Sequence, residues 1–472
     1  MPEIVNGITV PTEDDPVDLP GNLRAFAEGV GEVAQSIAED AGAAAAVGYA
    51  SSLDATKMRT VLDGDNDFTS GLTASTAQSI EPGETDPQAA VDARAARLGG
   101  PRTNKIVLLG NSRLERDYSD NGTSVYNSAK GIFTWANARL GGRFDVVKYA
   151  GVAGETLAEM ADRFADDVAA YSPAWVLLAD AVNDATNNRT TAQMIADTEA
   201  IIDLCRSIGA RPIILTAPPN NSHSSGQRSA LLGWNRWVKQ YPDPFVVPVD
   251  VAEPVTDAAG AYSTWYAEDG LHQSRAGAMR MGRVLAESLA PIVPPLDPFP
   301  SSPLDPTIFT LNPWMNGVSG SGVAANWTSS GTATFTKVVR NEGQATVWNE
   351  IEKTTTGTVF LQQTRSPAPA GMVAGVRVRL LFEMEIDDAS TLGDLSAQVQ
   401  LRNSSSSPIV TLAALAAWGT TTALGDLPTG EPIVLSSPAV ELPSGFHNFN
   451  FFLSFIGLGT VRVGRIAIVK VD

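Results

Sequence analysis

The sequence of 472 residues predicts a parallel α/β domain followed by an antiparallel β-sandwich. Between residues 101 and 290, short apolar segments alternate with amphipathic helical patterns, as in a parallel sheet covered by helices. Across residues 308–472, helical periodicity is nearly absent, and period-two segments rich in Thr, Val and Phe alternate with turn residues. The proline-rich segment 291–307 between them is expected to be a stiff, extended linker.

Composition excludes several classes of function. A net charge of −19 and a pI near 4.6 argue against binding to nucleic acid or to an anionic membrane surface, because both need basic patches. No stretch approaches the roughly 18 apolar residues of a membrane span. The single cysteine, Cys205, excludes an internal disulfide and a cysteine-based metal site, and its apolar helical surroundings predict a core position.

Residues 1–100 are predicted to be an N-terminal arm, a helix and a loop-rich segment. The helix is expected from Asn22 to about Ala50, with one apolar stripe on an alanine-rich background. Such a stripe needs a partner, which is a second copy of the helix, another protein on which it docks, or the α/β region of its own chain. The acidic segment 63–67 resembles a calcium loop, but it lacks the glycine and the final acid of such loops and is predicted to be a turn.

The α/β region contains five candidate strands and five helical patterns. The strands are predicted at Lys105–Leu109, Phe144–Tyr149, Trp175–Ala179, Pro212–Thr216 and Phe245–Val249. The helices are predicted near 128–140, 156–170, 190–208, 227–240 and 274–290. Parallel sheets of this kind bind ligands at the carboxyl ends of their strands, so polar residues at those ends are the candidates for chemistry.

Three strand ends carry such residues. Gly110-Asn-Ser112 follows the first strand and makes Ser112 a candidate nucleophile, although taken alone the segment is more typical of a strand-to-loop turn with a capping serine. Gly154 follows the second strand and can offer its N–H to a substrate, or simply form the turn before a helix. Asn183 follows the third strand and can donate to an oxyanion, or cap a loop.

A serine nucleophile needs a base, and the chain contains three histidines. His447 lies in the predicted β-sandwich, and His223 lies in a polar loop. His272 precedes the last predicted helix, and Asp269 stands three residues before it. A turn can return that carboxylate to the imidazole Nδ1, which makes His272 and Asp269 the preferred pair.

In the β-rich region, six strands are predicted from the alternation of apolar and polar residues. They are Thr332–Val339, Thr358–Gln363, Val376–Ile386, Ala397–Arg402, His447–Phe455 and Gly459–Val471.

Across roughly residues 103–290 the chain resembles an SGNH (GDSL-type) hydrolase. The segments that carry this resemblance are Gly110-Asn-Ser-Arg113, Gly151-Val-Ala-Gly-Glu-Thr156, Ala181-Val-Asn-Asp184 and Asp269-Gly-Leu-His272. The resemblance implies a flavodoxin-like three-layer α/β/α fold and a serine esterase that needs no metal or cofactor. It implies a catalytic set of Ser112, Asp269 and His272, and an oxyanion hole formed by Ser112, Gly154 and Asn183.

Four positions depart from the family's usual pattern. Asn111 and Ala181 replace the usual aspartate and glycine, Tyr149 stands where asparagine is common, and Gln273 stands where proline is frequent. All five functional positions are spared.

The flanking regions carry weaker resemblances. The segment around Asp18–Glu28 resembles the attachment ends of tail proteins from phages that infect actinobacteria, and the β-rich region resembles a carbohydrate-binding jelly roll. These resemblances imply a virion tail protein, made in the bacterial cytoplasm, that removes acyl groups from a host surface polysaccharide or glycolipid. Partners would be other tail proteins and further copies of the chain, as a trimer by analogy with tail spikes. The alternatives are a non-catalytic glycan-binding adhesin and a cellular lipase or thioesterase.

Overall fold

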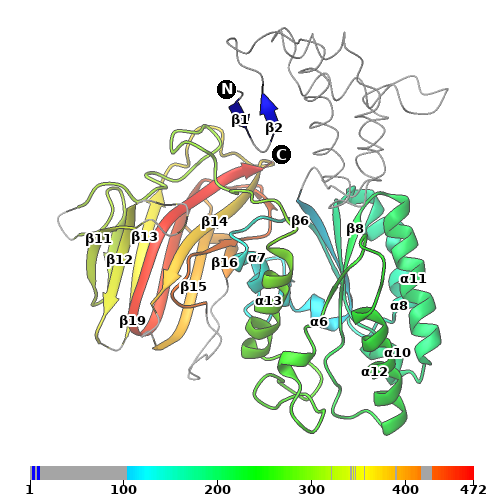
Figure 1. Ribbon diagram of the computed structural model, residues 1–472. Helices are drawn as coiled ribbons and strands as arrows, with labels where there is room; N and C mark the ends of the chain where they lie inside the picture. Colours follow the sequence, from blue (N-terminus) through cyan, green and yellow to red (C-terminus); the bar gives the residue numbers. More distant parts are fainter. Residues whose placement is uncertain are drawn as a thin grey trace, which may run out of the picture. The chain divides into compact units, whose positions relative to one another are not determined.

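The computed structural model describes residues 3–5, 8–10, 104–319, 322–340, 343, 345, 347–355, 357–387, 391–415 and 428–471 (Figure 1). The chain divides into two units, Met1–Gly100 and Pro101–Asp472. In the first unit, β1 (Glu3–Val5) and β2 (Ile8–Val10) form an antiparallel pair within the predicted arm. The predicted helix from Asn22 and the calcium-like segment 63–67 lie outside the described residues.

A five-stranded parallel sheet forms the centre of the α/β region, in the order β6-β3-β7-β8-β9. Its strands are β3 (Lys105–Gly110), β6 (Asp145–Gly151), β7 (Trp175–Leu178), β8 (Arg211–Leu215) and β9 (Val247–Val249). All four pairings are parallel, which confirms the predicted fold class. The three central strands, β3, β7 and β8, are nearly continuous apolar runs because both faces of the sheet are covered there.

Helices cover the two faces and complete three layers (Figure 1). One face packs on α7 (Ile132–Arg139) and α13 (Arg275–Leu289), and the other packs on the helices after β6, β7 and β8. These are α8 (Leu157–Asp162), α9 (Phe164–Asp167), α10 (Val182–Thr186), α11 (Thr191–Ser207) and α12 (Ser225–Lys239). Side chains along β3 alternate between the two cores, with Ile106 and Leu108 on one side and Val107 and Leu109 on the other.

One helix prediction was wrong. Residues 156–170 form α8, α9 and the 3₁₀ turn Ala169–Tyr171 rather than a single helix. The first break falls at Arg163, whose backbone (φ −96°, ψ 6°) leaves the helical region. Its guanidinium reaches back to the carbonyl oxygens of Gly110 and Ala150 at 3.0 and 2.7 Å. The break therefore coincides with a side chain that binds the ends of two sheet strands.

A hairpin that was not predicted follows the first strand. It consists of β4 (Tyr118–Asp120) and β5 (Ser124–Asn127), which pair antiparallel. β5 also pairs in parallel with β16 (Pro408–Leu415) of the β-rich region. The α/β region therefore contributes two strands to the sheet system of the β-rich region.

The β-rich region folds as two antiparallel layers, which confirms the predicted sandwich. Its strands are β10 (Thr328–Ser330), β11 (Thr334–Val339), β12 (Val347–Lys353), β13 (Thr358–Arg365), β14 (Arg377–Ile386), β15 (Thr391–Arg402), β16, β17 (Ile433–Ser436), β18 (Val440–Glu441) and β19 (Asn448–Val471). Two strands predicted separately, His447–Phe455 and Gly459–Val471, are one strand, β19. Its first half pairs with β13 and β15 and its second half with β12 and β14. Gly457 and Gly459, with φ of +125° and +124°, allow the strand to pass from one layer to the other.

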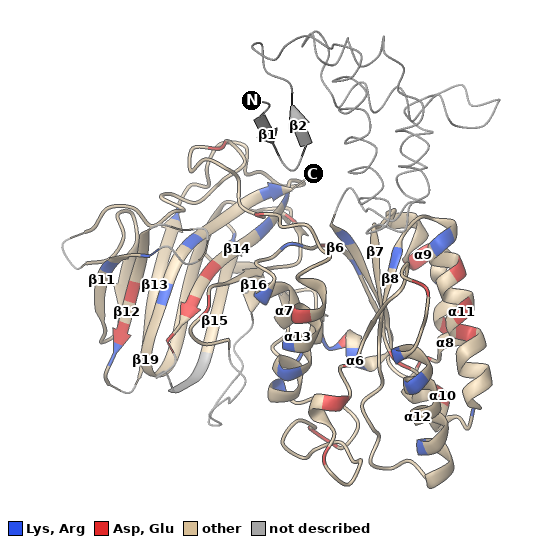
Figure 2. Ribbon diagram, viewed as in Figure 1, with Lys and Arg blue, Asp and Glu red and all other residues tan. Residues whose placement is uncertain are grey.

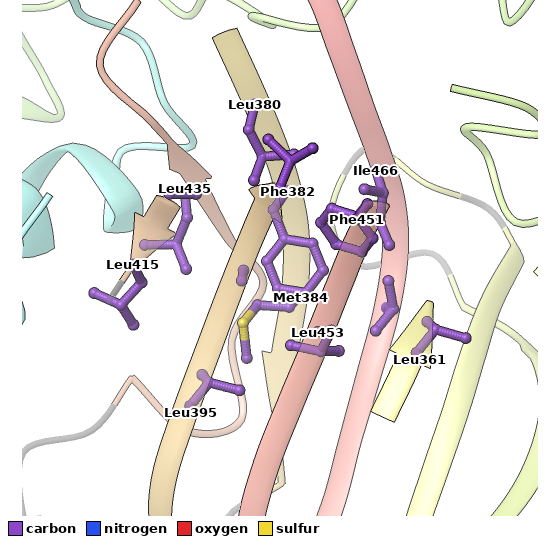
Figure 3. Packing of buried hydrophobic residues seen from close by; sticks show 14 of the residues in the cluster. Leu361, Leu380, Phe382, Met384, Leu395, Leu415, Leu435, Phe451, Leu453 and Ile466 are labelled. Carbon is purple, nitrogen blue, oxygen red and sulfur yellow. The ribbon is translucent and has the colours of Figure 1, made fainter. Parts of the chain in front are cut away.

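The core of the sandwich lies between the layers (Figure 3). Phe382 and Met384 of β14 meet Phe451 and Leu453 of β19, and all four side chains are buried. The two halves of β19 supply alternate residues to this core, as expected for a strand with one face covered.

The predicted linker 291–307 is not a free spacer. Phe299 is buried against Leu381 and Val434 of the β-rich region, and Asp297 pairs with Arg465 of β19. The segment also contains turns, such as the one in which the N–H of Asp305 donates to the carbonyl oxygen of Ser302, so it is not extended throughout. Acidic residues on β12 and β14 supply further partners for arginines of β19 (Figure 2).

Candidate active site

The candidate site lies at the carboxyl ends of three neighbouring strands, β3, β6 and β7. Gly110 pairs with Gly151 at the end of β3 and β6, and Leu109 pairs with Leu178 of β7. The loops after these strands therefore start side by side. Both glycines are required by packing, since a Cβ on Gly110 would lie 2.5 Å from the Cβ of Ala179 and one on Gly151 would lie 2.2 Å from the nitrogen of Glu115.

Ser112 is the first residue of the short helix α6 (Ser112–Glu115), and Asn111 caps that helix. The Asn111 Oδ1 accepts the N–H of Arg113 at 3.0 Å, and its Nδ2 donates to the carbonyl oxygen of Asp180 at 3.0 Å. An aspartate could accept the first bond but could not donate the second. Asn111 thus joins the loop after β3 to the loop after β7, which gives this departure from the family pattern a structural role.

The structure brings Ser112, His272 and Asp269 together. The His272 Nε2 lies 2.9 Å from the Ser112 Oγ, and the His272 Nδ1 lies 2.7 Å from the Asp269 Oδ2. The other carboxylate oxygen, Oδ1, accepts the N–H groups of Leu271 and His272 at 3.0 and 2.7 Å. A neutral imidazole with its proton on Nδ1 would donate to Asp269 and accept from Ser112, which is the arrangement that activates a serine as a nucleophile.

The charge of Asp269 is fixed by these bonds. Partial burial raises the pKa of its carboxyl group, but the bonds from the side chain and N–H of His272 and from the N–H of Leu271 outweigh that effect. The net result holds the pKa of Asp269 far below its ordinary value. The neighbouring acid, Glu268, is held ionised in the same way, because Lys130 and Arg116 lie 2.6 and 2.5 Å from its oxygens and lower its pKa.

The two further oxyanion candidates lie on the loops after β6 and β7. Gly154 is exposed with φ +84°, and a Cβ there would meet no atom within 4 Å. The Asn183 Nδ2 donates one hydrogen to the carbonyl oxygen of Glu155 at 2.8 Å, which joins the two loops directly beside Gly154. The second hydrogen of that amide remains for another acceptor. Within residues 104–319, neither the N–H of Ser112 nor that of Gly154 has an acceptor, so both are available to a ligand.

The other two histidines are placed elsewhere. His223 is 6% exposed, and its Nε2 lies 2.9 Å from the Thr186 Oγ1. Burial and the charges of Arg113 and Arg228 lower its pKa, which favours a neutral ring held in the fold. His447 is exposed in the β-rich region, where its N–H donates to the carbonyl oxygen of Arg402. Neither makes a hydrogen bond to Ser112 or Asp269.

Two arginines and a glutamine at the site were not predicted from the sequence. Arg113 is buried and pairs with Asp180 at 2.8 Å, and Arg163 binds the carbonyl oxygens at the ends of β3 and β6. The Gln273 Nε2 donates to the carbonyl oxygens of Arg113 and Lys130 at 2.7 and 3.0 Å, which a proline at this position could not do. A sequence signal did exist, since Arg113 and Asp180 are charged residues directly beside apolar strands that end at the site.

Metal sites and membrane-spanning helices are both absent from the described ranges. Within them, no three His, Cys, Asp or Glu side chains gather as a metal site would require. Over those same residues, every helix is too short or too polar to span a lipid bilayer.

One protein-family model matches part of the chain. Residues 108–280 match the model of the GDSL-like Lipase/Acylhydrolase family, and this span contains all five predicted site residues. No match was found among curated proteins.

Three solved structures illustrate the similarities. A putative lipolytic protein of the G-D-S-L family from Desulfitobacterium hafniense is 19% identical over 40% of this chain and 100% of its own, with a TM-score of 0.34. A catalytic mutant of an acetylxylan esterase from Geobacillus stearothermophilus is 18% identical over 39% of this chain and 94% of its own, with a TM-score of 0.33. The enzymatically active domain of tailspike protein 4 from bacteriophage CBA120 is 15% identical over 34% of this chain and 22% of its own, with a TM-score of 0.24. The family match supports a GDSL/SGNH-type acylhydrolase domain in residues 108–280.

Proposed function

We propose that the protein is a serine esterase in which Ser112 is the nucleophile, His272 the base and Asp269 the group that orients the base. The observation that carries this proposal is the pair of contacts of the His272 ring, 2.9 Å to the Ser112 Oγ and 2.7 Å to the Asp269 Oδ2. A nucleophile and a base within hydrogen-bond reach, with a third group fixing the base, is the arrangement that activates serine.

The first half of the proposed reaction forms an acyl-enzyme. His272 Nε2 takes the proton of Ser112 as its Oγ attacks the ester carbonyl carbon, and the π electrons of the carbonyl move to its oxygen. The N–H groups of Ser112 and Gly154 and the free hydrogen of the Asn183 amide donate to that oxyanion. The intermediate collapses when His272 gives its proton to the alkoxide, which leaves as the alcohol.

The second half regenerates the enzyme. Water loses a proton to His272 and attacks the acyl carbon, and the intermediate expels the Ser112 oxygen, which recovers its proton from His272. The product is a carboxylic acid. Throughout, the Asp269 carboxylate stays ionised and stabilises the imidazolium, because its pKa is held far below its ordinary value.

The test is hydrolysis of p-nitrophenyl acetate by the wild type and by Ser112→Ala. We expect the wild type to release p-nitrophenol and Ser112→Ala to be close to the uncatalysed rate. A fluorophosphonate probe should label the wild type and not the variant. Equal hydrolysis and equal labelling by the two proteins would exclude Ser112 as the nucleophile.

For the substrate, we propose acyl groups, chiefly O-acetyl, on host surface glycans, with the protein acting as part of a phage tail. Two features of the site support a bulky, polar substrate. Asp269 and His272 are open to solvent, with 49% and 19% of their side chains exposed. Trp265 is 54% exposed and stands at the start of the loop that carries Asp269 and His272. The loop is closed by Ser274, whose Oγ donates to the carbonyl oxygen of Trp265 and whose N–H donates to the carbonyl oxygen of Tyr266. An exposed indole ring can stack on a sugar.

An activity screen on purified host cell-wall glycans tests this substrate class. Acetate released from a glycan by the wild type, with KM raised several-fold in Trp265→Ala for the glycan and unchanged for p-nitrophenyl acetate, would support it. A preference for long-chain p-nitrophenyl esters would instead favour a lipase or thioesterase.

The second candidate is a glycan-binding adhesin with an inactive hydrolase scaffold. The departures at Asn111 and Ala181 are the observations that favour it, because both lie beside the predicted catalytic residues. It predicts glycan binding without fluorophosphonate labelling, whereas the esterase predicts labelling of Ser112.

A further inference from the structure

A buried ion pair lies directly behind the candidate nucleophile. The Arg113 Nη1 is 2.8 Å from the Asp180 Oδ2, and their side chains are only 1% and 5% exposed. Arg113 follows Ser112 in the chain, and Asp180 lies in the loop after β7. Removing two charges from water is costly unless their remaining hydrogen-bonding positions are also filled.

Backbone groups of the site loops fill those positions. Arg113 donates from Nε and Nη2 to the carbonyl oxygen of Leu271, at 3.1 and 2.9 Å, and from Nη2 to the carbonyl oxygen of Pro218 at 3.0 Å. The second carboxylate oxygen of Asp180 accepts the N–H of Val182 at 3.0 Å. The pair thereby joins the loops after β3, β7 and β8 to the loop before α13.

Three of the residues in these contacts are next to a residue used in the proposed reaction. Arg113 is next to Ser112, Leu271 is next to His272, and Val182 is next to Asn183. The carbonyl oxygen of Asp180 also accepts the Asn111 amide on the other side of Ser112. The Arg113–Asp180 pair therefore connects, through hydrogen bonds, the backbone segments that carry Ser112, His272 and Asn183.

We propose that the Arg113–Asp180 pair is a positioning device that sets the distance between Ser112 and His272 and places Asn183, without contacting substrate. This inference rests on the proposed esterase function. Arginine suits the role because its planar group can serve a carboxylate and two carbonyl oxygens at fixed angles, whereas the single ammonium of lysine cannot. Displacing a catalytic group by about 1 Å can cost roughly 100-fold in rate.

The experiment compares Arg113→Lys with a matched control, Arg465→Lys. Arg465 is also buried and ion-paired, to Glu383 at 2.5 Å and to Asp297 at 2.6 Å, but it lies in the β-rich region. We expect Arg113→Lys to lower kcat for p-nitrophenyl acetate about 10- to 100-fold with KM within about threefold. We expect Arg465→Lys to keep the wild-type kcat when both are assayed well below their melting temperatures.

Hydrogen exchange supplies a readout that does not depend on activity. Amide exchange in residues 266–274 should be faster in Arg113→Lys and unchanged in Arg465→Lys, because only the former releases the carbonyl oxygen of Leu271. Arg113→Gln, which is neutral and of similar length, should show the same acceleration if lysine proves too conservative.

The outcomes separate the positioning proposal from the proposed function. Wild-type kcat and wild-type exchange in both Arg113 variants would overturn the positioning role, as would an equal loss of kcat in Arg465→Lys. If the wild type hydrolyses no ester, the proposed function fails, and exchange alone decides. Faster exchange in the Arg113 variants would then still support the positioning role, and unchanged exchange would refute it.

Discussion

The α/β region and the β-rich region both bury arginines, but they use them differently. In the α/β region, the buried Arg113 donates mainly to backbone carbonyl oxygens of loops. The half-buried Arg163 divides its donors between the carbonyl oxygens at two strand ends and the carboxylates of Glu155 and Asp167. In the β-rich region, Arg462 and Arg465 of β19 bind carboxylates on the neighbouring strands β12 and β14. Arg465 also binds Asp297 of the proline-rich segment 291–307. The first pattern fixes loops that would otherwise move, and the second fixes strands that are already paired. We therefore expect changes at the buried polar residues that hold the loops of the candidate site to act on rate, and changes at buried polar residues elsewhere to act on stability.

The largest contrast on rate should come from the histidines. His272→Ala removes the proposed base and should lower kcat about 10⁴- to 10⁶-fold, whereas His447→Ala in the β-rich region should leave kcat unchanged. His223→Ala should also keep most activity, since its ring contacts Thr186 rather than Ser112. Steady-state hydrolysis of p-nitrophenyl acetate measures all three. A dead His223→Ala would show that the base has been misassigned or that His223 contacts substrate.

The next contrast pairs two asparagines. Asn183→Ala removes one oxyanion donor and should lower kcat about 100- to 1,000-fold with little change in melting temperature. Asn349 is fully buried in the β-rich region, where it accepts from Ala324 and donates to Thr336 at 3.0 and 3.1 Å. Asn349→Ala should leave kcat intact and cost about 1–3 kcal/mol of stability for each group left without a partner. The kcat and the melting temperature of both variants test these two predictions. A loss of kcat in Asn349→Ala, or a loss of stability without a loss of kcat in Asn183→Ala, would contradict the proposed difference between the two regions.

A smaller effect on rate is expected from Asn111→Asp. The new carboxylate would face the carbonyl oxygen of Asp180, which now receives the amide at 3.0 Å, and would place a second negative charge beside the Arg113–Asp180 pair. We expect kcat to fall about tenfold through displacement of Ser112. The control is Asn448→Asp in the β-rich region, where Asn448 is buried and donates to the carbonyl oxygen of Asn403 at 3.0 Å. Unchanged kcat in Asn111→Asp would mean that aspartate and asparagine are interchangeable there.

The smallest effect on rate, and a clear effect on stability, is expected at Asp117. This carboxyl group is fully buried, and burial raises its pKa to about 7 although the N–H of Thr134 donates to it at 2.7 Å. Between about pH 4 and pH 7 the unfolded chain ionises this group before the folded protein does, so its contribution to stability falls as pH rises and is constant above about 7. The difference in melting temperature between Asp117→Asn and the wild type should therefore shift in favour of the variant from pH 4 to pH 7. A difference that is constant over this range would contradict the raised pKa.

The two regions also differed in how far they could be predicted from the sequence. In the α/β region, buried strands such as Trp175–Leu178 are continuous apolar runs, so their positions followed closely from the pattern. The same periodicity put Ser112, Gly154 and Asn183 at one edge of the sheet. In the β-rich region, β12 and β16 were missed because their strand character depends on partners that are distant in sequence. The role of Arg113 was not predicted, because its position beside an apolar strand does not identify the partners that keep a charged residue buried.

The pairing of β5 with β16 has a consequence for how the chain is made. As the polypeptide is synthesised, Ser124–Asn127 emerges long before its parallel neighbour at Thr411–Ala413. Until then β5 presents an open edge, and open edges attract strands of other nascent chains. A shortened protein that stopped after α13 would keep that edge permanently. Recombinant work on the α/β region is therefore best done with the β-rich region attached, since β16 of that region covers the open edge of β5.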